Sequence, residues 1–171
     1  MKRFSVVSLS AMVLGLVLSP GSSVAQQKSL KEQLVGAWEL VSCERTTAKG
    51  APQPYCVNSI GILMFDASGR YAHIIGASGR PKITTFKRSD VPAEQYKAVA
   101  EGFLANFGTW SVNERDRTVT RHYLASMLPN YEGTDNKSSV KIVGDELTFE
   151  NPNPRADQDH ERSVNVYRRA K

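Results

Sequence analysis

Polar and apolar positions alternate along residues 37–45, as they do in a strand with one buried face. Trp38 and Leu40 fall on one side of this segment, and Cys43 falls on the other. Residues 57–65 are apolar on both sides, so a strand formed there needs a cover over its outer face. A turn at 66–69 then leads into a second strand, 70–75, which predicts an antiparallel pair.

The clearest local prediction is a hairpin formed by residues 138–143 and 146–150. Only Gly144 and Asp145 separate these segments, and a two-residue loop fixes the register of the strands that it joins. This register places Ile142 opposite Leu147 and Val140 opposite Phe149.

Two segments have a helical pattern. Ser29 and Glu32 form a capping box ahead of a short helix that ends near Leu34 and plugs one end of the fold. Later, apolar residues recur at steps of three and four, which predicts a helix of roughly 13 residues. They are Tyr96, Val99, Ala100, Phe103 and Phe107. This helix either covers the wall formed by 57–65 or closes the mouth of the fold.

Further strands are predicted at 109–113, 118–126 and 162–168, with a shorter extended piece near 82–86. The total of about eight or nine short strands favours an all-β antiparallel barrel or sandwich. GAW at 36–38 and GTW at 108–110 begin two similar runs of strands. A glycine that turns the chain, followed by an inward Trp, is how a small barrel floors a cavity, and such a cavity suits an apolar molecule.

The first residues resemble an export signal. Lys2 and Arg3 precede an apolar stretch at 4–18, and the small residues 23–25 fit a cleavage site. We therefore expect a signal peptide at 1–25 and one mature domain at 26–171, periplasmic or secreted, without an integral membrane segment. The alternative is an uncleaved membrane anchor.

Export changes the expectation for the two cysteines, Cys43 and Cys56. In an oxidising compartment they are expected to form a disulfide that closes a loop of about 13 residues. The alternative is a pair of buried free thiols. Their spacing is not that of a redox-active Cys-x-x-Cys motif.

The net charge of +5 is only mildly basic, and loss of Lys2 and Arg3 leaves 20 basic against 17 acidic residues, a charge of +3. The basic residues are scattered and form no stripe with aromatic residues, so a nucleic-acid partner is not expected. One local cluster consists of Arg80, Lys82, Lys87 and Arg88. It is interpreted as a solvated face, with steering of an anionic ligand as the alternative.

Several segments resemble the bacterial lipocalin-like domain family, a group with calycin-type barrels. They are LVGAWELVSCE from 34, SIGILMFDASGRYAHII from 59, GTWSVNERDRTVTRHYLASMLPNYEGTD from 108, GDELTF from 144 and NVYRRA from 165. The resemblance implies an antiparallel barrel with one open mouth and a cavity for a small hydrophobic molecule. It also implies that Trp38 packs at the closed end beneath Arg168 or Arg169.

Two histidines, His73 and His122, lie within predicted strands and could meet across the interior. In 118–126, either His122 or the pair Arg121 and Tyr123 faces inward, and the pattern does not decide which. An inward Arg121 would favour a ligand with an acidic head group. The loop 127–133 adds a possible gate. The candidate ligand contacts are therefore Trp38, Leu40, His73, His122, Tyr123, Asn130 and Tyr131.

The function expected from these features is binding of a small hydrophobic molecule in the barrel. No catalytic motif, metal-ligand spacing or cofactor motif stands out, so no catalytic residue, metal or cofactor is assigned. One alternative is an isomerase, cyclase or hydratase of the same architecture, with His73 or His122 as acid or base. Another is a partner-binding module with a filled barrel. The sequence leaves the oligomeric state open.

Overall fold

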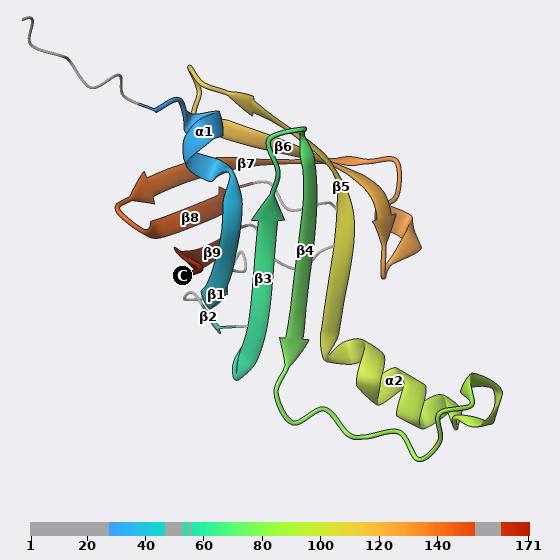
Figure 1. Ribbon diagram of the computed structural model, residues 1–171. Coiled ribbons are helices and arrows are strands. Elements are labelled where there is room, and N and C mark those ends of the chain that lie inside the picture. Colours follow the sequence, from blue (N-terminus) through green and yellow to red (C-terminus); the bar gives the residue numbers. More distant parts are fainter. Residues whose placement is uncertain (1–27, 47–52, 55, 153–161) are drawn as a thin grey trace, which may run out of the picture.

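The structure is a computed structural model that describes residues 28–46, 53–54, 56–152 and 162–171. Its strands form one antiparallel sheet in the order β2-β1-β3-β4-β5-β6-β7-β8-β9, and β1 also pairs with β9. This last pairing closes the sheet into a barrel, as the sequence predicted (Figure 1). The predicted signal peptide lies outside the described residues.

The strands follow one another around the barrel in chain order, apart from the short β2, which extends the edge of β1. Their bounds are β1 Gly36–Thr46, β2 Gln53–Pro54, β3 Ser59–Phe65, β4 Arg70–Ala77, β5 Phe103–Asn113, β6 Thr118–Ser126, β7 Asp135–Val143, β8 Glu146–Asn151 and β9 Arg162–Arg169. The helices are α1 Leu30–Leu34 and α2 Ala93–Glu101, with single 3-10 turns η1 Arg88–Asp90 and η2 Pro129–Tyr131. The piece predicted at 82–86 is not a strand.

The predicted hairpin is confirmed as β7 and β8, with Ile142 opposite Leu147 and Val140 opposite Phe149. Val140, Leu147 and Phe149 belong to the buried core, and Ile142 packs against it. Gly144 has a φ of 58°, a backbone conformation that costs glycine little, and this lets the two-residue turn connect the strands tightly.

One end of the barrel is closed by α1 (Figure 1). The predicted capping box is present, since the backbone N–H of Glu32 donates to Ser29 Oγ and that of Ser29 donates to Glu32 Oε2. The carboxylate of Glu114, beyond β5, accepts from the backbone N–H groups of Leu30 and Lys31 at 2.8 and 3.0 Å. These contacts fix the helix over the interior, where Leu30 and Leu34 are buried.

Trp38 lies at this closed end, as predicted. Its indole N–H donates to the carbonyl of Leu34 at 2.8 Å, and the Arg169 guanidinium lies 4.0 Å from the ring centroid. Of the two arginines considered, Arg169 is therefore the residue that covers the ring. It also donates to the carbonyls of Val35 and Gln33 at 3.2 and 2.6 Å, so it ties β9 to the segment that enters β1.

The mid-chain helix is shorter than predicted. It ends at Glu101, and Phe103 and Phe107 belong to β5, which begins at Phe103 rather than at 109. The reason is that Gly102 ends the helix and the following residues pair with β4, with Gly76 opposite Phe103 and Ala72 opposite Phe107. The spacing of the two phenylalanines fitted a helix, but hydrogen bonding to a neighbouring strand decided the outcome.

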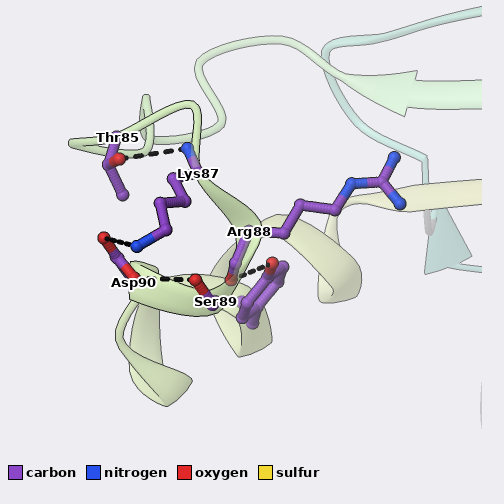
Figure 2. A network of polar contacts seen from close by, with 6 residues as sticks. Thr85, Lys87, Arg88, Ser89 and Asp90 are labelled. Atoms are coloured by element: carbon purple, nitrogen blue, oxygen red, sulfur yellow. Dashed lines mark hydrogen bonds and ion pairs between the residues drawn. The ribbon is translucent and has the colours of Figure 1, made fainter.

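Helix α2 extends from the end of the barrel opposite α1, beyond the ends of β4 and β5 (Figure 1). The segment before it is held by polar contacts, including an ion pair between Lys87 and Asp90 at 3.2 Å and a hydrogen bond from the Tyr96 hydroxyl to the Arg88 carbonyl at 2.7 Å (Figure 2). The Arg88 guanidinium points away from this network (Figure 2). No α2 residue is fully buried.

The outer face of β3 is not covered by α2, contrary to one of the two sequence-based expectations. Ile60 is 75% exposed and Met64 is 40% exposed, whereas Leu63 and Phe65 are buried inside the barrel. The helix also contributes no residue to the cavity wall among those the structure describes. It therefore flanks the open end without covering either the wall or the mouth.

The predicted disulfide is confirmed. Cys43 of β1 and Cys56 are bonded, with their Cα atoms 5.6 Å apart. Cys43 is buried on the inner side of the open half of β1, opposite Asn165 of β9, and not on the face away from Trp38 as simple alternation predicted. The reason is that the pairing of β1 with β9 shifts between Leu40 and Ser42. The bond links that half of β1 to the turn that leads into β3.

Candidate functional site

A cavity of about 230 Å³ occupies the half of the barrel away from α1. An aromatic cluster separates it from the closed end, with Phe65 between Trp110 at 4.7 Å and Phe149 at 6.0 Å between ring centroids. Phe149 also lines the cavity, so this cluster is its floor. The volume is somewhat below the range of about 300–1,000 Å³ typical of drug-sized ligands, which indicates a smaller molecule.

The cavity wall has two chemically different parts. Near the strand ends the wall is apolar beside β4, β5 and β6, and polar beside β1, β8 and β9, where Arg45, Asn151 and Ser163 lie. Farther in, the wall is mainly polar. The apolar set comprises Ile75, Phe103, Leu104, Met127 and Leu128. The polar set includes His73, Asn106, Arg121, Asn136, Ser138 and Asn165. The site is therefore amphipathic rather than simply hydrophobic.

Strand β6 presents Val119, Arg121 and Tyr123 to the interior, which answers the question that its sequence left open. Arg121 is only 8% exposed and lines the cavity together with Tyr123. His122 points to the outer face, where its Nδ1 lies 2.7 Å from Asp135 Oδ1. The two histidines therefore do not meet across the interior.

His73 lies in the cavity wall on β4 and is 5% exposed. Its Nε2 is hydrogen-bonded to the Tyr167 hydroxyl at 3.0 Å. Burial, with a smaller contribution from the positive charge of Arg121, lowers the pKa of His73 to about 3. The imidazole is therefore neutral at pH 7, and the cavity carries no charge from this residue.

Tyr71 lies beside the cavity, and its ring is 5.8 Å from the Arg121 guanidinium. Burial raises the pKa of its hydroxyl, although the nearby positive charge of Arg121 acts in the opposite direction. Tyr71 is thus neutral as well, and its buried hydroxyl oxygen has no hydrogen-bond partner among the described residues.

The loop after β6 contributes to the rim through Tyr131, whose ring stacks on Tyr123 with 5.8 Å between centroids. Its neighbour Asn130 is exposed and is not part of the wall. The 3-10 turn η2 orients these two residues differently, so the loop places an aromatic ring rather than an amide at the cavity.

Of the seven candidate ligand contacts, the structure places His73, Tyr123 and Tyr131 around the cavity. Trp38 is fully buried in the closed end, and Leu40 packs against the core, so neither lines the cavity. His122 and Asn130 lie outside it. The candidate list omitted all the apolar residues of the rim and the polar inner wall, formed by Arg121, Asn106, Asn136, Ser138 and Asn165. The alternation of Val119, Arg121 and Tyr123 was the one signal that pointed to this set.

Among the residues that the structure describes, no group of three or more His, Cys, Asp or Glu side chains is arranged to hold a metal ion. Within that same part of the chain, no helix has the length and apolar character needed to cross a membrane. The wall offers hydrogen bonds, the cations of Arg121 and Arg45, and apolar side chains on one side of the rim.

A family model described as a lipocalin-like domain matches residues 35–170. This range runs from the residue before β1 to the residue after β9, so it includes every barrel strand and the cavity wall. A search of curated proteins gave no match.

Proposed function

The chain belongs to the lipocalin-like domain family, and we propose that it is an exported protein that binds one small amphipathic molecule in its barrel. The observation that carries this proposal is the hollow of about 230 Å³, which has apolar side chains on the β4–β6 side of its rim and a mainly polar inner wall. Burying the apolar part of a ligand against the rim contributes about 0.8 kcal/mol per methylene group. The polar side chains of the inner wall orient the polar end of the ligand.

Export is supported by two features. The disulfide between Cys43 and Cys56 is a bond that persists in oxidising compartments. The sequence of residues 1–25 fits a cleaved signal peptide, which leaves a mature domain at 26–171. We place the protein in the periplasm or outside the cell.

Native mass spectrometry of the mature protein, isolated from its own cells, tests this proposal. A variant with a filled cavity is needed to show that any bound molecule lies inside the barrel. Ile75→Trp places a large ring in the wall, because Ile75 lines the cavity and is 7% exposed. Ile74→Trp is the matched control, since the neighbouring side chain lies on the outer face and is 38% exposed. The wild type and Ile74→Trp are expected to carry a co-purified small molecule that Ile75→Trp lacks.

Two outcomes contradict the proposal. One is an Ile75→Trp protein that folds, as judged by circular dichroism, and retains the added mass. The other is a wild-type protein that carries no added mass and shows no heat of binding with 1-octanol, a neutral eight-carbon probe.

A further inference from the structure

Arg121 is a buried cation that has no anionic partner among the residues that the structure describes. Its side chain lies in the cavity wall, and 8% of its surface is exposed. Within the described ranges, neither Asp nor Glu forms an ion pair with it. Nor does any Asp or Glu of those ranges line the cavity, although Arg45 adds a second cation at its mouth.

Neutral groups hold the guanidinium in place. One Nη donates to Asn136 Oδ1 at 2.7 Å, and the same oxygen accepts from Ser138 Oγ at 3.1 Å. The Tyr71 and Phe149 rings lie 5.8 and 5.4 Å from the guanidinium carbon. Nε is buried without a hydrogen-bond partner in the described structure. These contacts fix the orientation of the Arg121 guanidinium, but no described side chain supplies a negative charge to balance it.

A charge removed from water is costly unless it is paired. His73 and Tyr71, the titratable neighbours, are both neutral and provide no negative charge. Asn106, also 8% exposed, has a buried Oδ1 without a partner among the described residues. Several polar groups around one cation therefore lack the partners that a folded interior normally supplies.

We propose that Arg121 receives the carboxylate of the small amphipathic ligand, with the apolar part of that ligand directed toward the rim. This inference rests on the proposed function and specifies its ligand class. The planar guanidinium matches the two oxygens of a carboxylate. The limited volume of about 230 Å³ fits a compact acid rather than a long lipid.

The direction of the ligand follows from where the two kinds of wall residue lie. Phe103 and Leu104 begin β5, and Met127 and Leu128 follow the end of β6, so all four lie at the open end. Arg121 lies farther in, in the middle of β6 opposite Asn136 of β7. A ligand with its acid group inside leaves its apolar part against the β4–β6 side of the rim, since Arg45, Asn151 and Ser163 make the opposite side polar.

The test compares octanoate with octanamide, which has the same chain and a neutral head group, by isothermal titration at pH 7 and constant ionic strength. The wild type is expected to bind octanoate about 10- to 100-fold more tightly than octanamide, the effect of hydrogen bonds to a charged group. In Arg121→Gln this preference disappears, because octanoate loses far more affinity than octanamide. Arg45→Gln, which alters the other cation of the wall, keeps most of the preference.

A second measurement separates the head-group site from the cavity as a whole. Acetate, compared with chloride at equal ionic strength, is expected to raise the melting temperature of the wild type but not of Arg121→Gln. If acetate has this effect and neither eight-carbon probe binds, the carboxylate site stands and the proposed binding of an amphipathic molecule with an apolar chain fails.

Equal affinity for octanoate and octanamide in the wild type, without an acetate effect, overturns the carboxylate site and leaves the proposed function in place. The assignment is also overturned if Arg45→Gln loses the preference for octanoate and Arg121→Gln keeps it. In that case Arg45, at the mouth of the cavity, binds the carboxylate.

Discussion

The two ends of the barrel each contain an arginine beside aromatic rings, but the two side chains have different surroundings. At the closed end, Arg169 covers Trp38, donates to two backbone carbonyls and has the Asp145 carboxylate 4.0 Å away. In the cavity, Arg121 contacts one neutral hydrogen-bond partner, Asn136, and two aromatic rings among the described residues. Arg169 thus connects parts of the fold, whereas Arg121 is oriented toward a space that the protein leaves open.

This contrast distinguishes an arginine that stabilises the fold from one that is available to bind a ligand. Both residues lie near aromatic faces, so proximity to a ring does not distinguish them. What differs is whether the chain itself satisfies the guanidinium. Substitutions at the closed end should therefore lower stability, whereas substitution of Arg121 should alter ligand binding.

The largest expected effect is that of Trp38→Ala at the closed end. Removing a fully buried Trp leaves a cavity and deprives the Leu34 carbonyl of its donor, which should lower the free energy of unfolding by about 3–5 kcal/mol. Urea denaturation measures this. Ligand affinity of the folded fraction should change little, and a selective loss of affinity without loss of stability would place Trp38 in the binding site.

Arg169→Gln is expected to lower stability by about 2 kcal/mol, because two carbonyls lose charged donors and Trp38 loses its cation. Thermal and urea unfolding test this. The neighbouring Arg168→Gln is the control, since Arg168 is exposed on the same strand. If both variants were equally stable, the closed end would not depend on this contact.

His73 should make stability depend on pH. Its pKa is about 3 in the folded state against 6.5 ordinarily, so between these values only the unfolded chain takes up the proton. Stability should therefore fall as pH drops from about 6.5 toward 3, by up to about 1.4 kcal/mol per pH unit from this group. In His73→Gln that contribution disappears. Identical pH profiles of unfolding for the two proteins would contradict the neutral buried imidazole.

The smallest effect on stability is expected for Arg121→Met in the ligand-free protein. Replacing an uncompensated buried charge with an apolar chain of similar length should leave the free energy of unfolding within about 1 kcal/mol of the wild type, or raise it. A fall as large as that of Arg169→Gln would make Arg121 a structural residue and remove the contrast between the two ends.

The sequence predicted the closed end better than the cavity, and the difference has a physical basis. The capping box of α1, an arginine over Trp38 and the β7–β8 register depend on local spacing or on the family pattern. The cavity depends on which face of β6 points inward. Thr120, His122 and Leu124 are as plausible an inner set as Val119, Arg121 and Tyr123 when only alternation is considered.

Local irregularities also limited the prediction. The pairing of β5 with β6 shifts between Phe107 and Gly108, and a Cβ at Gly108 would collide with the carbonyl oxygen of His122. This glycine therefore allows a close approach of two strands, whereas Gly36 has a φ of 128° at the start of β1. The two Gly-x-Trp segments look alike in sequence, but their glycines meet different physical requirements.

The pairing of β1 with β9 has a consequence for how the chain acquires its structure. These strands are more than one hundred residues apart along the chain, yet Trp38 lies opposite Arg169. Contacts between such distant segments form slowly, because much of the chain must first be ordered. During synthesis, β1 has no β9 neighbour until residues 162–169 have been made. A circular permutant that joins the two strands through a short linker and opens the chain in the β7–β8 turn should therefore fold faster than the natural order of strands.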